Sequence, residues 1–194
     1  MTKPTGWIVA MACIFSAALR AGTGPAENWT RPVEVTYESK RCIAFRARLS
    51  GSFLVVEAAP SAGWHTFAMD NAERAAEKLQ GKKSLGLDLP TEIIVANGLE
   101  VEGPWYQTPP KDFSQPELRW FSWGFEGLSL FAAKVRRTGP GPAQVAIRGQ
   151  VCTEEICRRV DVAITIPLAG TGTEASDIDL KSLVQVQRAG PGSR

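Results

Sequence analysis

The sequence predicts an all-β fold, and an immunoglobulin-like β-sandwich is the specific expectation. About eight short segments alternate apolar and polar residues, turn residues separate them at regular spacing, and only one segment has helical periodicity. The 194 residues, 44% of them hydrophobic, suffice for one domain with a buried core. We therefore expect two packed sheets, one short helix in an insertion and a flexible C-terminal tail.

Turn residues (Gly, Pro, Asn or Ser) lie near the ends of most of the expected strands. The run 53–59 is apolar almost throughout, which indicates a central strand. Asn97-Gly98 is a strong hairpin turn pattern. The strands are expected at 33–37, 42–49, 53–59, 64–67, 91–95, 99–101, 128–135, 143–149 and 160–167.

Residues 70–83 form the helical segment. Asp70 or Asn71 can cap its start and Gly81 can end it. Its apolar face is modest, so we expect a surface helix within a loop insertion. A further short amphipathic element is expected within 177–187. The apolar positions of the helix are Ala72, Ala75, Ala76 and Leu79.

The N-terminus has the pattern of a secretory signal peptide. Lys3 precedes an apolar run at 7–19, and small residues follow it. We expect residues 1–22 to be cleaved and the mature protein to be periplasmic or otherwise exported, touching a membrane only if this segment stays attached. The remaining chain divides into an N-terminal arm at 23–32, a domain at 33–168 and a polar tail at 169–194.

Charge and histidine content narrow the classes of function. The formal net charge is +2 and the basic residues are scattered, so we expect no nucleic-acid partner. His65 is the only histidine, which weakens the interpretation that the protein uses a Ser-His or Cys-His catalytic pair. A zinc site has suitable ligand types, but their spacing matches no common zinc pattern. We expect neither a metal nor a cofactor. The ligand types in question are those of Cys42, Cys152, Cys157 and His65.

Cys152 and Cys157 lie between two runs of alternating apolar and polar residues, each of which is expected to form a strand. This cysteine pair is the main candidate for a functional site. Six residues in an extended strand would hold the two Cα atoms roughly 16–17 Å apart, far beyond disulfide reach. If the two cysteines interact, the chain must turn back between them, which a hairpin with 153–156 at its tip achieves. Cleaving the signal peptide removes Cys13 and leaves Cys42 as a third cysteine, expected to be a buried inert thiol.

Residues 105–126 are rich in aromatic residues and proline, and we expect a long irregular segment here. Long loops in compact domains tend to be functional. The segment could stack on sugars or bases, although no basic patch accompanies it, and packing is the alternative.

The order of several short motifs resembles the N-terminal periplasmic domain of the thiol:disulfide interchange protein DsbD. The likeness covers roughly 33–167, and the fold of that family is an immunoglobulin-like sandwich. The motifs are 63–67 (Gly-Trp-His-Thr-Phe), 89–93 (Leu-Pro-Thr-Glu-Ile), then Gly98, Val101 and Gly103-Pro104, and the cysteine pair on a late hairpin.

The resemblance implies a redox function for the cysteine pair. In that family the pair receives electrons from a membrane-embedded domain through a thioredoxin-like domain, and passes them to disulfide isomerases and cytochrome c maturation proteins. Cys152 and Cys157 match the pair, and the second cysteine, Cys157, is implied to form the mixed disulfide. No counterpart of the membrane or thioredoxin-like domain occurs in this chain, so a separate thioredoxin-like protein or DsbD-type membrane donor is expected.

The family also shields its cysteines with an aromatic ring on a cap loop. Here residues 111–113 are most similar to that cap. Phe113 is the expected shield, and Asp112 is its neighbour in the cap. Phe121 and Trp123 are the competing candidates. Two departures from the family are Arg158-Arg159 after the second cysteine, and a longer link at 70–87.

Two functions therefore stay open from the sequence. The first is an exported thiol–disulfide exchange domain, acting as a component of protein-disulfide reduction. The second is a non-enzymatic immunoglobulin-like binding module whose disulfide is structural. Glu154 and Glu155 disfavour a thiolate while Arg158 and Arg159 favour it, so charge does not decide. Trp64 and His65 are expected to be a packing pair.

Overall fold

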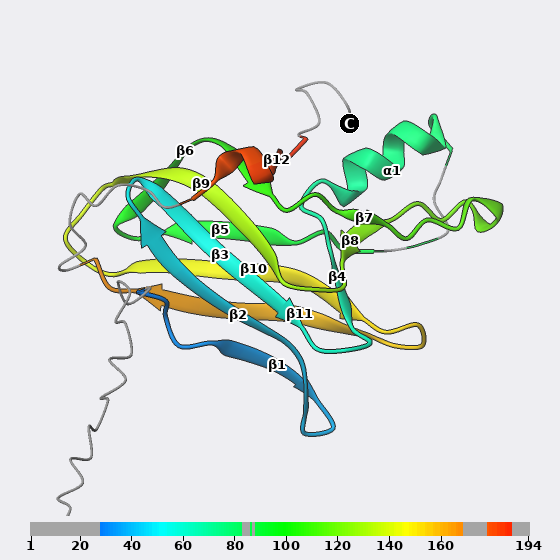
Figure 1. Cartoon of the computed structure of the whole chain (residues 1–194), viewed down its shortest axis with the longest axis horizontal. Helices are drawn as coiled ribbons and strands as arrows, with labels where there is room; N and C mark the ends of the chain where they lie inside the picture. Colours follow the sequence, from blue (N-terminus) through cyan, green and yellow to red (C-terminus); the bar gives the residue numbers. More distant parts are fainter. Residues whose placement is uncertain (1–27, 83–85, 87, 169–177, 188–194) are drawn as a thin grey trace, which may run out of the picture.

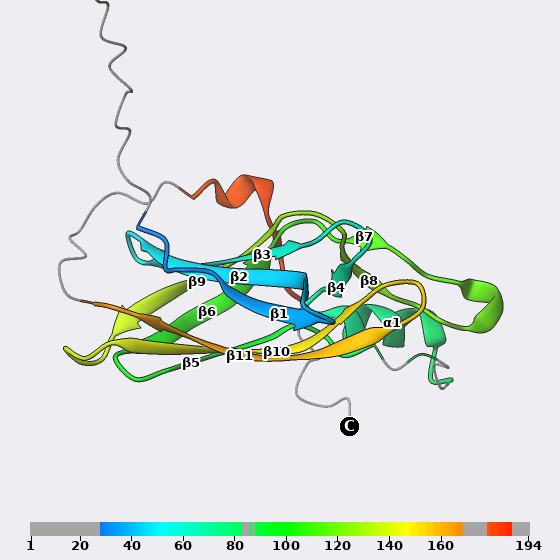
Figure 2. The ribbon, with the colours of Figure 1, turned by 90° about the horizontal axis from the view of Figure 1, so that it is seen from below.

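The protein is a β-sandwich of two facing sheets with one short helix at an end (Figures 1 and 2). The computed structural model describes residues 28–82, 86, 88–168 and 178–187. The expected signal peptide with Cys13 lies outside the described residues, as do 169–177 and 188–194 of the expected tail. The predicted all-β class, the two sheets and the single short helix are confirmed.

The first sheet has the strand order β1-β2-β3-β9-β6-β12, and all its neighbours are antiparallel. β3 lies inside this sheet, as its continuous apolar sequence predicts. The strands are β1 (Val33–Tyr37), β2 (Lys40–Ser50), β3 (Phe53–Pro60), β6 (Leu99–Gln107), β9 (Ser129–Arg137) and β12 (Val184–Gln185).

The second sheet has the order β11-β10-β4-β8-β7, and β5 also pairs with β10. The expected strands near 64–67, 91–95, 143–149 and 160–167 are all present in it. Its strands are β4 (His65–Phe67), β5 (Glu92–Ala96), β7 (Lys111–Asp112), β8 (Trp123–Phe125), β10 (Ala143–Cys152) and β11 (Cys157–Ile166).

The hydrophobic core lies between the sheets, because alternate strand residues point inward. Phe45 and Phe131 from the first sheet and Phe125 from the second are at most 5% exposed. Phe125 meets Phe131 edge to face across the layers, with ring centroids 5.6 Å apart. Each such ring contributes roughly 1.5–3 kcal/mol by its burial. This core gives the sheets the rigidity on which a site at their end depends.

One edge of β10 serves two strands. β5 pairs with residues 144–148, whereas β4 pairs with Val151 and Cys152. Gly149 lies between these two stretches with φ +145, and a Cβ there would come within 2.9 Å of the Pro90 carbonyl oxygen. Glycine is therefore needed where the chain entering β5 passes β10. This arrangement gives the end of β10, and so Cys152, a neighbouring strand on both sides.

The segment 105–126 is more ordered than its sequence predicts. Residues 105–107 continue β6, 111–112 and 123–125 form β7 and β8, and a 3-10 turn, η1 (Pro116–Leu118), lies between. β6 can pass through Pro104 because its register shifts between Val101 and Trp105, with Gly103 at φ +89. The expected irregular segment is therefore interrupted by short strands, while residues 108–110, 113–114 and 121–122 have no regular structure.

Helix α1 (Asn71–Leu79) lies within the predicted range. Asp70 makes no capping bond and is buried. Its carboxylate instead accepts hydrogen bonds from Arg74 at 2.8 and 3.0 Å, from Gln107 at 2.6 Å and from the Gln187 amide at 3.0 Å. Burial would raise the pKa of Asp70, but these bonds outweigh it and lower the pKa.

The chain segment 178–187 is tied to the sandwich. The amphipathic element expected here consists of a 3-10 turn, η2 (Leu180–Ser182), and β12, which pairs with β6. Val186 is buried and its amide donates to the Trp105 carbonyl at 2.9 Å. Together with the Asp70–Gln187 bond, this anchors residues 184–187 beside helix α1.

Both views place three features at one end of the molecule (Figures 1 and 2). These are the tip of the β10–β11 hairpin, helix α1 and the β7–β8 excursion. The described N-terminal residues of the arm approach from the opposite end. The cysteine hairpin is thereby brought to the aromatic-rich segment, although the two are separate in sequence.

Candidate functional site

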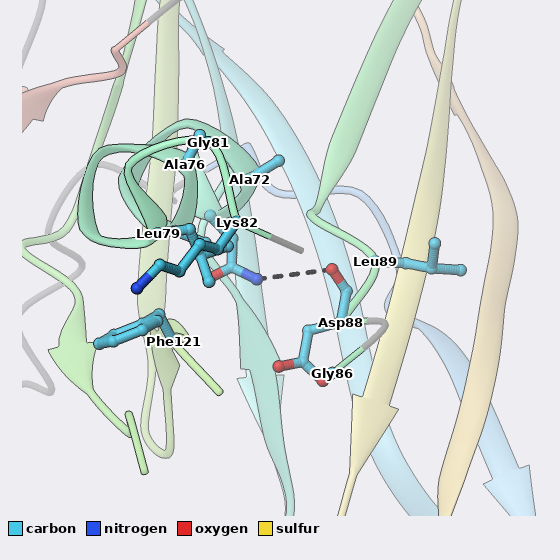
Figure 3. Close-up of a pocket in the computed structure, with 11 residues that line it drawn as sticks. Ala72, Ala76, Leu79, Gly81, Lys82, Gly86, Asp88, Leu89 and Phe121 are labelled. Atoms are coloured by element: carbon cyan, nitrogen blue, oxygen red, sulfur yellow. Dashed lines mark hydrogen bonds between the residues drawn. The ribbon is translucent and has the colours of Figure 1, made fainter. Parts of the chain in front are cut away.

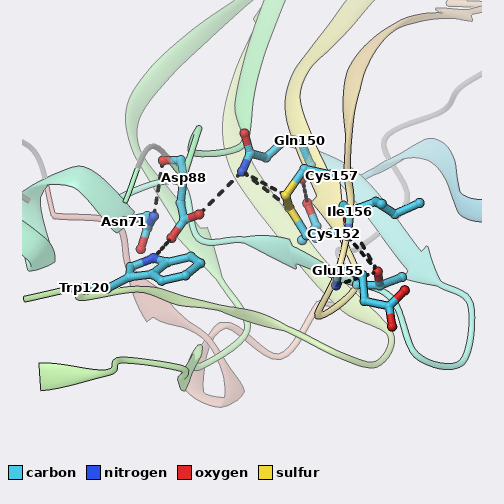
Figure 4. Close-up of a disulfide and its surroundings, with 10 residues drawn as sticks. Asn71, Asp88, Trp120, Gln150, Cys152, Glu155, Ile156 and Cys157 are labelled. Carbon is cyan, nitrogen blue, oxygen red and sulfur yellow. Dashed lines mark hydrogen bonds between the residues drawn. A yellow bond between two sulfur atoms is a disulfide. The ribbon is translucent and has the colours of Figure 1, made fainter. Parts of the chain in front are cut away.

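The two cysteines form a disulfide that closes the tip of the β10–β11 hairpin (Figure 4). The register pairs Cys152 directly with Cys157. At the tip the Thr153 amide donates to the Ile156 carbonyl at 2.8 Å, and the Thr153 hydroxyl accepts from the amides of Glu155 and Ile156. The predicted hairpin with 153–156 at its tip is confirmed, and its turn is held by hydrogen bonds that do not involve the sulfurs.

The two cysteine residues differ in solvent exposure. Cys152 lies between β11 and β4, with His65 as its register partner on β4, and is 2% exposed. Cys157 is the first residue of the edge strand β11 and is exposed. A partner approaching from solvent therefore reaches Cys157 first.

Gln150 supplies a polar group at the disulfide. It stands two positions before Cys152 on β10, so both side chains lie on the same face of the strand. Its side-chain Nε2 donates to Cys152 Sγ at 3.4 Å and to Cys157 Sγ at 3.8 Å. The same nitrogen donates to Asp88 Oδ1 at 3.5 Å, and the other oxygen of Asp88 accepts from the Trp120 indole (Figure 4).

An open cleft of about 500 Å³ adjoins the disulfide. Phe113 lines it, and its ring centroid lies 5.0 Å from that of His65. Asp112 lies outside the lining and accepts a hydrogen bond from the Ser114 amide at 2.8 Å, which braces the turn that carries Phe113. Of the candidate shields, Phe113 is the one that shares a cleft with the cysteines.

The other two candidate shields lie elsewhere. Trp123 is 8% exposed and packs in the core, because β8 lies between β4 and β7. Phe121 lines a second pocket, of about 380 Å³, between α1 and the segment around Asp88 (Figure 3). Leu79 lines the same pocket, whereas neither cysteine does. Neither aromatic ring is thus placed to cover the disulfide.

The cleft is lined by carboxylates. Asp88, Glu126, Glu154 and Glu155 all contribute to its lining. Arg158 lies outside it, with its guanidinium 3.7 Å from the centre of the Tyr37 ring. Side chains alternate along β11, which turns Arg158 to the face opposite Cys157. The cleft lining thus contains four carboxylates and no Lys or Arg, although Lys111 pairs with Glu126 at 2.7 Å; the sequence had left the sum of these charges open.

His65 and Trp64 have different surroundings. Trp64 is partly buried against the core, as expected of a packing residue. His65 lies beside the disulfide and also contacts Phe67, with centroids 5.3 Å apart. Burial lowers the pKa of His65, while Asp88 and Glu126 oppose this shift. The imidazole is therefore neutral near pH 7 and acts at the site as an aromatic neighbour of Phe113.

Cys42 is a free, buried thiol on β2, as the sequence predicts. Burial raises the pKa of the Cys42 thiol, and Arg158 partly offsets this.

No group of three or more His, Cys, Asp or Glu side chains among the described residues is arranged to hold a metal ion. No helix in the described ranges is long and apolar enough to cross a membrane.

Sequence reasoning missed three residues that the structure brings to the cysteines. Gln150 could have been found, because strand periodicity places it on the face of Cys152. Asp88 and Trp120 could not, since Asp88 reaches Gln150, and Trp120 reaches Asp88, from segments distant in sequence. His65 had been identified only as a packing residue.

The chain was compared with known proteins. No protein-family model and no curated protein matches it. Among solved structures, the reduced N-terminal domain of DsbD from Neisseria meningitidis aligns with 75% of this chain and 91% of its own, at 12% identity and a TM-score of 0.46.

Two further structures align less closely. The complex of the DsbD and PilB N-terminal domains from Neisseria meningitidis covers 70% of this chain and 89% of the other, at 12% identity and TM-score 0.39. The GAE domain of GGA2p from Saccharomyces cerevisiae covers 70% and 97%, at 10% identity and TM-score 0.35.

Proposed function

We propose that the protein is an exported thiol–disulfide exchange domain that relays electrons through Cys152 and Cys157 to or from a thioredoxin-like partner. The observation that supports this most is the unequal exposure of a disulfide at a hairpin tip. Both cysteines line the open cleft, but Cys157 is exposed, whereas Cys152 is 2% exposed. A disulfide with a purely structural role needs no cleft, whereas an exchange reaction needs an accessible sulfur and room for the attacking group.

The exchange proceeds in two steps. A partner thiolate attacks Cys157 Sγ, the Cys152–Cys157 bond breaks, and its electron pair leaves on Cys152 Sγ as a thiolate. A second thiolate of the partner then attacks the partner sulfur of the mixed disulfide. Cys157 leaves as a thiolate, the partner becomes a disulfide, and both released sulfurs take up protons from water. Run backwards, the same steps carry electrons from this domain to the partner.

Phe113 is proposed to restrict this reaction to proteins that can displace it. Its ring lines the cleft and rests against His65, which is neutral near pH 7. The segment that carries it is attached by the two-residue strand β7, by the bond from the Phe113 amide to the Ser122 carbonyl at 2.9 Å and by the bond from the Ser122 amide to the Ser114 hydroxyl at 3.1 Å. A docking protein can move so short an attachment more easily than a residue of the core.

The test is to trap the mixed disulfide. The oxidised protein, with Cys42→Ala to remove the third thiol, is mixed with a thioredoxin that lacks its second active-site cysteine, and free thiols are alkylated. We expect a cross-link through Cys157 and alkylation of Cys152, detected by peptide mass spectrometry. A cross-link through Cys152 would reverse the proposed order of attack. If no cross-link forms and the disulfide opens only in denaturant, the domain is a binding module with a structural disulfide.

A further inference from the structure

Gln150 has an unusual position for an amide side chain. It is 9% exposed, at the end of β10 beside the disulfide. A buried amide requires hydrogen-bond partners, because an unsatisfied one keeps the full cost of its desolvation. The partners that its Nε2 finds are both sulfurs and the Asp88 carboxylate (Figure 4).

The exchange reaction creates a difficulty that this amide can relieve. When a partner thiolate attacks the exposed Cys157, negative charge develops on Cys152 Sγ, which is 2% exposed. Burial disfavours that charge, and the carboxylate of Asp88 in the same cleft disfavours it further. A leaving sulfur departs faster when its thiolate is stabilised. A hydrogen-bond donor aimed at Cys152 is thus needed most during this step.

We propose that Gln150 is a catalytic residue of the exchange, whose Nε2–H donates to Cys152 Sγ as this sulfur leaves as a thiolate. The inference rests on the proposed function and adds the group that stabilises the leaving sulfur. The donor already lies 3.4 Å from Cys152 Sγ in the disulfide. A hydrogen bond to a charged acceptor is stronger than one to a neutral acceptor, so this bond strengthens as the sulfur gains charge.

Asp88 and Trp120 act as positioning residues for this amide. A carboxylate only accepts hydrogen bonds, so Asp88 requires that the nitrogen of Gln150, and not its oxygen, faces this side. The Trp120 indole donates to the other oxygen of Asp88 and fixes the carboxylate in turn. With one N–H held by Asp88, the second N–H of Gln150 is directed to the sulfurs. The reversed amide would present its oxygen to a developing thiolate and repel it.

The first measurement is the rate at which dithiothreitol reduces the disulfide in the folded protein. Gln150→Leu keeps the size of the side chain and removes the donor. We expect the reduction to slow about tenfold, the effect of losing one hydrogen bond to a charged group. Gln144→Leu is the matched control, because Gln144 lies on the same strand and bonds only to Thr165 within the hairpin. The control should react at the wild-type rate.

The second measurement separates stabilisation of charge from a change of fold. In Cys42→Ala/Cys157→Ala, which leaves Cys152 as the thiol of the folded domain, the thiolate of Cys152 is titrated by its ultraviolet absorbance, with and without Gln150→Leu. We expect about a tenfold smaller thiolate fraction at a fixed pH when the donor is lost. Gln150→Glu is a further variant, whose carboxyl regains a donor when protonated. Its rate relative to wild type should recover as the pH falls.

The outcomes distinguish the inference from the proposed function. If the wild-type disulfide resists dithiothreitol until the protein unfolds, the proposed function fails and the inference fails with it. If the wild type is reduced in the folded state but Gln150→Leu matches it in rate and thiolate fraction, only the role of Gln150 is overturned. A pH-independent rate ratio for Gln150→Glu would contradict that role as well.

Discussion

Opening the Cys152–Cys157 disulfide should lower the free energy of unfolding only modestly. The loop that it closes spans a sequence separation of 5. The chain-entropy relation gives about 2 kcal/mol for so short a loop. Nine further register pairs, Ala143↔Ile166 to Val151↔Arg158, and the Thr153–Ile156 bond hold the same hairpin without the sulfurs. Because small domains are stable by about 5–15 kcal/mol, the reduced protein should remain folded.

The assay is urea unfolding of the oxidised protein, the reduced protein and Cys152→Ala/Cys157→Ala. We expect the last two to lose about 2 kcal/mol each and to keep one cooperative transition. Cys42→Ala in the oxidised form controls for the third thiol. Loss of cooperative unfolding on reduction, or a loss above about 5 kcal/mol, would refute the reasoning, since the disulfide would then be a staple on which the fold depends.

Three further predictions concern the surroundings of the site. Asp70→Asn should lower the free energy of unfolding by about 2–4 kcal/mol in urea, because it breaks a buried ion pair, and the exposed Asp161→Asn should change it by less than about 0.5 kcal/mol. Since the pKa of Asp70 is lowered in the fold, its contribution is present above the unfolded pKa and is lost below about pH 4; equal stability of wild type and variant at neutral pH would contradict this. Phe113→Ala should speed reduction of the disulfide by dithiothreitol several-fold, whereas Phe121→Ala, in the pocket beside α1, should not. Equal rates for the two variants would contradict the proposal that Phe113 shields the disulfide. Because the pKa of His65 is lowered in the fold, the unfolded chain binds its proton more readily, and stability should fall as the pH drops below about 6.5; His65→Phe should flatten that decline, and an unchanged slope would count against it.

The features that the sequence predicts well have local determinants. The hairpin at 153–156 follows from two alternating runs joined by four residues, and the β5–β6 turn follows from Asn97-Gly98, which adopt φ +53 and +71. Period-two alternation is also sufficient to place Gln150 on the same strand face as Cys152 and Arg158 on the face opposite Cys157.

The features that it predicts poorly depend on contacts between distant segments. Trp120 and Asp88 are separated by 32 positions, and Asp88 and Gln150 by 62. Whether Phe113 or Trp123 faces the disulfide depends on β8 being an inner strand and β7 an edge strand. No local sequence pattern predicts this strand order, because it depends on which strands pair with β4 and β10 in the folded sheet.

The most direct test of the central claim is the redox equilibrium of the folded protein against glutathione, with thiols counted by alkylation and mass spectrometry. A working exchange pair should open and close reversibly at a potential above about −300 mV, while Cys42 stays unmodified because it is buried. A potential below about −300 mV, with opening only when the fold is lost, would show that the disulfide is structural.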